Sequence, residues 1–377
     1  MIRIPFNRPF ATGKEIDYIR AAIATPKLSG DGPNTAQCHG LLERSLGIQK
    51  ALLTTSCTHA LEMAAFLLDM GPGNEIVLPA FTFPSTANAF VLRGARPVFV
   101  DIRADTLNID EKRIEERITK HTKAIFLVHY AGVGCEMETI IAVARRHRLA
   151  VVEDNAHGLY GKYRDRYLGT FGELAAVSFH ETKNFTCGEG GALLINDARF
   201  IERAEILREK GTDRSRFFRG EVEKYNWVDI GSSYLPSDLL AAFLRAQLEH
   251  RDQIQSARQR LWENYMRELS GWATDNGVRL PTIPPECEQS YHMFYLILPS
   301  LGSRQALISH LSQREIFAVF HYLPLHLSPM GRTFGGREGD CPATEKISQC
   351  LLRLPFYTGM TTTEQAQVIE AVSEFRC

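Results

Sequence analysis

Lys183 is the residue whose surroundings in the sequence most clearly indicate chemistry. It follows an apolar stretch at 175–179, and the glycine-rich segment 188–191 comes shortly after it. A lysine at a strand-to-turn junction can be partly desolvated, which lowers the pKa of its amine and lets it attack carbonyl groups. A loop lysine is more often an ordinary solvated side chain, so Lys183 needs a chemical partner before it indicates a function.

A carboxylate at the end of a second apolar stretch supplies that partner. Residues 149–152 read Leu-Ala-Val-Val, and Glu153 and Asp154 follow them. A lysine that forms a Schiff base, with a carboxylate that keeps a pyridinium nitrogen protonated, is what pyridoxal 5'-phosphate (PLP) requires of a protein. A buried Asp154 would also need a partner, which a pyridinium provides. We therefore predict PLP as the cofactor.

Other residues fit the same pocket less specifically. The segment 54–58, Thr-Thr-Ser-Cys-Thr, precedes a helical pattern, and helix N-termini attract anions. Alone it indicates a simple N-cap, but Ser178 at another strand end favours a phosphate pocket. Phe83 follows a strand and could stack on a flat ring, although loop aromatics more often fill the core. His157 lies three residues after Asp154 without a cluster of metal ligands, so we expect no metal.

A basic segment interleaved with phenylalanine occupies 208–219. A solvated loop explains it about equally well. Guanidinium groups suit a diphosphate, however, so we interpret the segment as a candidate contact for a nucleotide-linked substrate. Its candidate residues are Lys210, Arg214, Arg216 and Arg219.

The elements that must position these residues alternate along the first two thirds of the chain. Helical periodicity occurs at 61–68 and 137–148 between apolar runs. This alternation predicts an α/β fold with a mostly parallel sheet, in which ligands bind outside the carboxyl ends of the strands. The candidate strands are 51–53, 75–78, 97–100, 124–129, 149–154, 175–179 and 192–195.

The pattern changes after about residue 245. A long helical region at 239–262 precedes several prolines. A strand at 292–298, a helix at 305–311 and a strand at 317–322 then indicate a smaller α+β unit. Because 377 residues exceed what one small core needs, we predict a large α/β domain over 1–248 and a small C-terminal domain over 249–377.

The composition narrows the class of protein. A net charge of −1 gives no field that would recruit nucleic acid or an acidic membrane. No apolar stretch is long enough to span a bilayer, and the first residues lack the apolar core of a signal peptide. The eight cysteines contain no Cys-x-x-Cys pair, which argues against a zinc ribbon. We expect a cytoplasmic enzyme.

Together these segments resemble the sugar-nucleotide aminotransferases of the DegT/DnrJ/EryC1/StrS family. The resemblance covers essentially the whole chain, and its most specific segments are 152–157, 178–184 with 188–191, and 322–326. It implies the PLP-dependent type I fold, similar to that of aspartate aminotransferase. It also implies a homodimer whose active sites take residues from both subunits.

The resemblance implies a role for each matching position. Lys183 would bind PLP covalently, Asp154 would face the pyridine nitrogen, and His157 would lie close to the ring hydroxyl. The remaining matching positions are Phe83, which would stack on the ring, the phosphate-binding Cys57, Thr58 and Ser178, and the candidate substrate contacts Tyr322 and His326.

One segment departs from the family pattern. Many members carry Gly-Tyr-Asn-Tyr-Arg where residues 231–235 read Gly-Ser-Ser-Tyr-Leu. The family's Asn reaches the cofactor phosphate of the partner subunit, so we expect Ser233 to replace it. The absent Arg leaves open how the donor carboxylate and the sugar nucleotide are bound.

The segments 208–220 and 231–235 are similar to one branch of the family, which forms dTDP-4-amino-4,6-dideoxygalactose for surface polysaccharides. This similarity implies amino transfer from glutamate to the C4 ketone of dTDP-4-keto-6-deoxyglucose. The alternatives are the 4-amino gluco epimer or a 3-amino sugar. A related dehydratase is disfavoured because such enzymes have histidine at the position of Lys183. A non-catalytic PLP-binding regulator is disfavoured by the lack of a DNA-binding segment.

Overall fold

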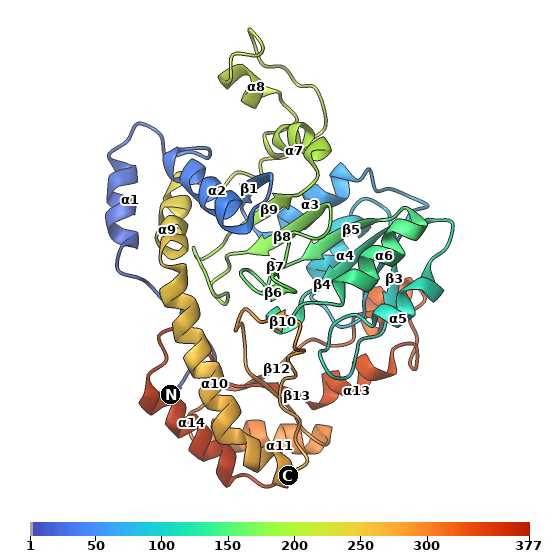
Figure 1. Cartoon of the computed structure of the whole chain (residues 1–377), viewed down its shortest axis with the longest axis vertical. Coiled ribbons are helices and arrows are strands. Elements are labelled where there is room, and N and C mark those ends of the chain that lie inside the picture. The colour runs from blue at the N-terminus through green and yellow to red at the C-terminus, as the bar shows by residue number, and fades with distance from the viewer. Residues whose placement is uncertain (1–2) are drawn as a thin grey trace.

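The computed structural model describes residues 3–377 and contains a large sheet flanked by helices (Figure 1). The strands of this sheet are β1 (Lys50–Thr54), β2 (Glu75–Pro79), β3 (Arg96–Val100), β4 (Thr122–Val128), β5 (Ala150–Asp154), β8 (Leu174–Ser178) and β9 (Gly191–Ile195). Their spatial order is β1-β9-β8-β5-β4-β2-β3. Neighbours from β8 to β3 pair in parallel, and β9 runs antiparallel to β8 and β1. The predicted mostly parallel sheet is confirmed.

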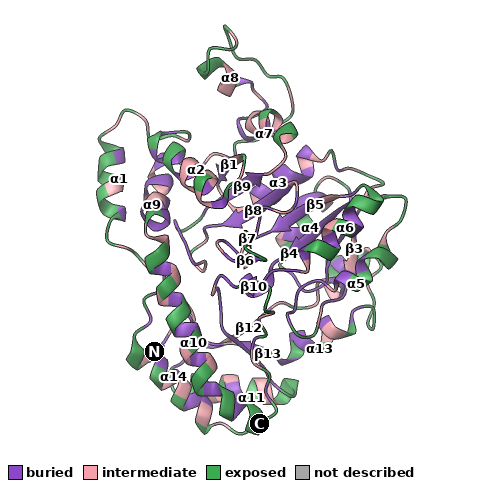
Figure 2. Cartoon of the chain, viewed as in Figure 1, coloured by how far each residue is buried: buried purple, intermediate pink, exposed green. Residues whose placement is uncertain are grey.

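Alternate side chains of each strand face opposite layers of helices. In β4, Phe126 packs against α3 (Cys57–Leu67) and α4 (Pro84–Val91), whereas Leu127 packs against α6 (Met137–His147). Both faces of the strands are therefore buried, as Figure 2 shows. The other helices of this part are α1 (Glu15–Ile23), α2 (Pro33–Leu46), α5 (Glu111–Ile114), α7 (Ile201–Arg208), α8 (Arg214–Phe218) and α9 (Asp238–Glu249).

The chain after α9 builds a second core. Its elements are α10 (Arg251–Asp275), β11 (Tyr295–Ile297), α11 (Leu301–Ser312), β12 (Val319–Phe320), α12 (Pro329–Thr333), α13 (Pro342–Cys350), β13 (Leu351–Arg353) and α14 (Thr362–Glu374). The strands form an antiparallel sheet in the order β11-β13-β12. Tyr265, Phe294 and Leu352 are buried in this core. Ile4, near the start of the chain, belongs to the same core and pairs with Ile316.

A third, very small sheet joins the two parts of the chain. Its strands are β6 (Lys162–Tyr163), β7 (Arg166–Tyr167) and β10 (Cys287–Glu288). The pairing of β10 with β6 brings the segment after α10 against the loops of the large sheet. The short 3-10 helices are η1 (Glu115–Arg117), η2 (Tyr130–Gly132), η3 (Ala198–Phe200) and η4 (Leu325–Leu327).

Two elements differ from the sequence-based prediction. The helical region predicted at 239–262 is two helices, α9 and α10, because the backbone of His250 leaves the helical conformation between them. The strand predicted at 317–322 is only β12, since Tyr322 has a φ of 27°, which an extended strand does not contain. None of the helices within residues 3–377, α10 included, is long and apolar enough to cross a membrane.

The division into domains 1–248 and 249–377 stays a prediction. The separate core around β11, β12 and β13 supports it, and His250 lies beside the predicted boundary. Ile4 does not follow this division, because it packs into the core that the later residues build.

A buried carboxylate ties α2 to α9. Asp238 is fully buried and accepts hydrogen bonds from the backbone N–H and the side chains of Asn34 and Thr35, at 2.9–3.3 Å. These residues form the first turn of α2, whose N–H groups have no acceptor within the helix. A Cβ on Gly32 would overlap the carboxylate of Asp238, so the chain needs glycine at this N-cap.

We predict that Asp238→Ala lowers the free energy of unfolding by about 3 kcal/mol, because it leaves several buried donors without an acceptor. The measurement is urea unfolding followed by circular dichroism. Asp252→Ala is the control, since the side chain of Asp252 is 91% exposed and makes only a local ion pair. A loss at Asp238 no larger than the loss at Asp252 would contradict the anchoring role.

Candidate active site

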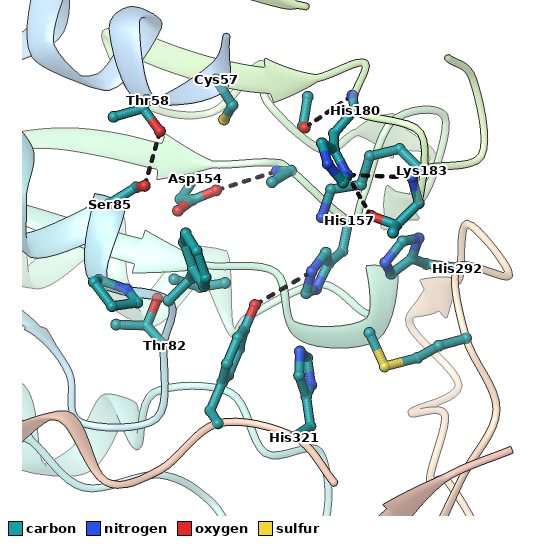
Figure 3. Close-up of a pocket in the computed structure, with 18 of the residues that line it drawn as sticks. Cys57, Thr58, Thr82, Ser85, Asp154, His157, His180, Lys183, His292 and His321 are labelled. Carbon is teal, nitrogen blue, oxygen red and sulfur yellow. Dashed lines mark hydrogen bonds between the residues drawn. The ribbon is translucent and has the colours of Figure 1, made fainter. Parts of the chain in front are cut away.

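A cavity of about 920 Å³ opens between the carboxyl ends of the large sheet and the small C-terminal sheet. Figure 3 shows side chains from both parts pointing into it. The sequence predicts that a ligand binds at this edge of the sheet. The candidate residues that line the cavity are Cys57, Thr58, Phe83, Asp154, His157, Ser178, Lys183 and Tyr322.

Lys183 lies in the turn after β8, where its backbone N–H donates to the carbonyl of His180. Burial lowers the pKa of the Lys183 amine to about 8, although the nearby carboxylate of Asp154 opposes this effect. A substantial fraction of the amine is therefore neutral close to physiological pH. A neutral amine is the form that attacks a carbonyl carbon or accepts a proton.

Asp154 is the last residue of β5 and is buried at the floor of the cavity. One carboxylate oxygen accepts from the hydroxyl of Thr86 at 2.7 Å, and the other accepts from the backbone N–H of Ala156 at 3.2 Å. Burial raises the pKa of Asp154, while the charge of Lys183 partly offsets that rise. A cationic partner in the cavity would favour the ionised carboxylate.

Glu153, the residue before Asp154, points to the opposite face of the sheet. It is fully buried and accepts from the N–H groups of Gly169, Phe171 and Gly172 at 2.6–2.7 Å. The Nε2 of His129 lies 2.8 Å from its carboxylate. Because the N–H of Cys135 donates to Nδ1 of the same ring, Nε2 carries the proton and donates to Glu153.

The N-terminus of α3 faces the cavity at Cys57 and Thr58. The Ser56 hydroxyl caps the helix by accepting from the N–H of His59. The Thr58 hydroxyl lies 2.8 Å from that of Ser85 (Figure 3). Burial raises the pKa of the Cys57 thiol well above its ordinary value, so this side chain stays neutral. A helix N-terminus lined by hydroxyls and a neutral thiol suits a phosphate.

The close approach of β9 to this helix depends on a glycine. A Cβ on Gly191 would overlap the backbone of Ser56 and Cys57. Glycine at this position therefore lets the start of β9 lie against the first turn of α3.

Aromatic and imidazole rings line the side of the cavity opposite α3. His157 stacks on His292 with ring centres 4.3 Å apart, and His321 stacks on Tyr322 at 3.6 Å. Burial lowers the pKa of all three histidines well below the ordinary value, so they are neutral. The Tyr322 hydroxyl lies 3.4 Å from Nε2 of His157. Phe83 is half-exposed, with its ring 6.3 Å from that of Tyr322.

A segment close to the N-terminus, Phe6 and Asn7, lies on one side of the cavity. The Asn7 side chain donates to the carbonyl of Glu181 in the lysine turn at 3.1 Å. This contact joins the N-terminal segment to the turn that carries Lys183.

The residues present fit PLP. Lys183 supplies the amine, Asp154 is buried and forms no ion pair among residues 3–377, and the N-terminus of α3 suits the phosphate. In addition, Nδ1 of His157 is buried without a hydrogen-bond partner among the described residues. A ligand with polar groups would satisfy that atom.

Several residues of the site were not identified as candidates in the sequence. Thr86, which orients Asp154, falls inside a helix where a threonine is unremarkable. His292, His321 and Arg353 come from short strands and loops more than 100 residues after Lys183, and only the tertiary fold brings them to the cavity.

Other candidate residues lie outside the cavity of this chain. His326 is fully buried, with Nε2 3.0 Å from the carboxylate of Glu345. Ser233 is exposed on the segment between α7 and α9. The basic residues of that segment form ion pairs with nearby carboxylates: Lys210 and Arg214 with Glu209, and Arg219 with Glu205 and Glu221.

We predict that the cofactor-free protein reacts with added PLP at a rate that rises with pH and levels off above about 8. The depressed pKa of Lys183 makes its amine neutral there, whereas an ordinary lysine would need pH above 10. The measurement is stopped-flow absorbance of the bound cofactor between pH 6 and pH 10. A rate that still rises at the upper end of this range would contradict the assignment, and Lys183→Ala is the control without the amine.

Comparison with known proteins identifies the family that this sequence matches. The sequence profile of the DegT/DnrJ/EryC1/StrS aminotransferase family matches residues 10–373. The spore coat polysaccharide biosynthesis protein SpsC of Bacillus subtilis is 31% identical, over 98% of this chain and 96% of that protein. GDP-perosamine synthase of Escherichia coli O157:H7 is 28% identical, over 99% and 98% of the two chains.

The fold is similar to that of a solved aminotransferase structure. The protein Spr1654 of Streptococcus pneumoniae, described as a sugar aminotransferase, matches in its PMP form with a TM-score of 0.92 and 26% identity, over 99% of each chain. Its PLP form matches as well, with a TM-score of 0.90. The predicted PLP-dependent type I fold and the predicted cofactor are confirmed. The chain belongs to the DegT/DnrJ/EryC1/StrS aminotransferase family.

Proposed function

We propose that this protein transfers an amino group from glutamate to the C4 ketone of dTDP-4-keto-6-deoxyglucose and forms dTDP-4-amino-4,6-dideoxygalactose. The observation that carries amino transfer is the pairing of Lys183, whose pKa is about 8, with the buried Asp154 in one cavity. A histidine at the lysine position would instead favour dehydration.

Each cavity residue has a defined task in this reaction. PLP, when bound, supplies an electron sink for the carbon that loses a proton. The amine of Lys183 removes the proton from the donor and returns it to the neighbouring carbon, acting as base and then as acid. Asp154, held by Thr86 and Ala156, would accept a hydrogen bond from the protonated ring nitrogen. His157 is neutral and can hydrogen bond to the ring hydroxyl.

A nucleotide-linked keto sugar is the substrate class that we favour. The cavity of about 920 Å³ lies near the upper end of common ligand pockets, which leaves room for a substrate beside the cofactor. The names of the relatives, a GDP-perosamine synthase and a spore coat polysaccharide protein, support this class and a role in surface-polysaccharide synthesis. The dTDP base and the galacto product rest on the resemblance of the segments 208–220 and 231–235.

We infer a cytoplasmic location from the absence of disulfide bonds among the eight cysteines. All eight cysteines are free, and most of them are buried, which fits a reducing compartment.

A homodimer with shared active sites is part of the proposal. Figure 1 shows α8 projecting from the body of the large sheet. The segment around it exposes several large apolar side chains, and Trp227 is 80% exposed. Exposed apolar surface of this kind favours a protein contact. In a dimer this segment would bring Ser233, Arg214 and Arg219 to the partner's cavity.

The assay that tests the function combines purified protein, PLP, glutamate and dTDP-4-keto-6-deoxyglucose, with NMR assignment of the product. We expect an axial C4 amine and formation of 2-oxoglutarate. An equatorial amine would assign the gluco epimer, and an amine at C3 would overturn the position of transfer. Lys183→Ala is expected to lose at least about 1,000-fold in turnover, as removal of an essential base does.

For the dimer, we predict that replacing both Phe218 and Trp227 by serine shifts the protein from two chains to one in light scattering. Activity should fall with the loss of the shared site. Leu92→Ser is the matched control, because Leu92 is 70% exposed but lies at the end of α4, away from this segment. A double variant that remains a dimer would rule out this segment as the contact.

A further inference from the structure

Arg353 is a cation on the cavity wall that forms no ion pair with a carboxylate among residues 3–377. It lies at the end of β13, the central strand of the C-terminal sheet. Its Nε is buried without a hydrogen-bond partner, and one terminal nitrogen donates to the carbonyl of Phe320 at 3.2 Å. The guanidinium stacks over the ring of Phe6 at 4.6 Å.

The two fully buried arginines, Arg208 and Arg258, are satisfied by the protein itself. Arg208 donates to the carboxylate of Asp31 and to the carbonyl of Leu53. Arg258 donates to two backbone carbonyls and to the hydroxyl of Thr358. Arg93 and Arg304 share with Arg353 a buried Nε that has no partner among the described residues, but they do not line the cavity. A guanidinium carries several donors, and burying them unpaired is costly. Arg353 therefore has donors left over for an anion that enters the cavity.

The position of Arg353 limits which anion this is. Arg353 lines the same cavity as Lys183 and donates to the carbonyl of Phe320, the residue before His321. The ring of His321 lies 6.0 Å from that of His157, so Arg353 is on the His157 side of the cavity. Cys57 and Thr58, at the N-terminus of α3, lie on the side of the cavity opposite His321 (Figure 3). We therefore assign the cofactor phosphate to the N-terminus of α3 and a different anion to Arg353.

A nucleotide diphosphate fits this position less well. The sugar ring separates the diphosphate from the carbon that receives the amine, so the diphosphate would lie away from Lys183. A carboxylate bonded to the reacting carbon itself must lie beside Lys183. The α-carboxylate of an amino acid meets this requirement, because its α-amino group takes the place of the lysine amine.

We propose that Arg353 binds the α-carboxylate of the amino donor and of the 2-oxo acid that the donor becomes. The proposal rests on the proposed amino transfer. A planar guanidinium donates two parallel hydrogen bonds to a carboxylate, which fixes the direction of the Cα–H bond toward Lys183.

The test follows the glutamate half-reaction of the PLP-loaded protein by absorbance, without any nucleotide sugar. We expect Arg353→Met to raise the apparent Kd for L-glutamate about 10- to 100-fold, as loss of charged hydrogen bonds does. L-Glutamine, which lacks the side-chain charge, should lose affinity by the same factor. Arg353→Lys should restore part of the affinity, because it keeps the charge but not the two parallel hydrogen bonds.

Binding of 2-oxoglutarate and of dTDP, measured by calorimetry, gives a second readout without turnover. Arg353→Met should weaken 2-oxoglutarate and leave dTDP unchanged. Arg267→Met is the control, since Arg267 is exposed on α10 and contacts only Glu268 and Asn264 of the same helix through its guanidinium among the described residues. Retained cofactor absorbance and an unchanged Tm would show that each variant is folded.

Three results would overturn the proposal. Unchanged affinity for both amino acids would remove Arg353 from the donor site. A loss confined to glutamate would assign Arg353 to the side-chain carboxylate, and a loss confined to dTDP would assign it to the diphosphate. If the wild-type half-reaction with glutamate proceeds but no keto sugar is aminated, the sugar assignment fails while the role of Arg353 stands.

Discussion

The buried carboxylate of Glu153 is the interaction on which the geometry of the cavity depends. It holds the loop at 169–172 through backbone N–H groups and holds the end of β4 through His129. A carboxylate removed from water is stable only when such donors surround it. Because side chains alternate along a strand, fixing Glu153 on one face fixes Asp154 on the other.

Desolvation gives the cavity its chemical character. Burial moves the pKa values of Lys183, His157, His292 and His321 downward and that of Asp154 upward, so each group shifts toward its neutral form. The charged partners that reverse these shifts come with the ligands. A site built in this way binds charged groups strongly because water competes little with them.

The sequence predicted the large sheet, and it located Lys183 and Asp154, because strand, turn and polar residue are neighbours in the chain. It predicted the second half of the site less well. His292 precedes, His321 follows and Arg353 ends a strand of two or three residues, too short for an alternating pattern to show. Tyr322 was identified only through its resemblance to a family motif. The break at His250 also had no local signal, since no glycine or proline marks it.

Contacts of the N-terminal segment determine when the cavity can form during folding. Ile4 pairs with Ile316, Phe6 lies under Arg353, and Asn7 contacts the turn that carries Lys183. During translation these residues leave the ribosome long before β12 and β13 are made. Such contacts have very large sequence separation and form late in folding. The large sheet can therefore form early on the ribosome, but the pocket becomes complete only when nearly the whole chain has been synthesised.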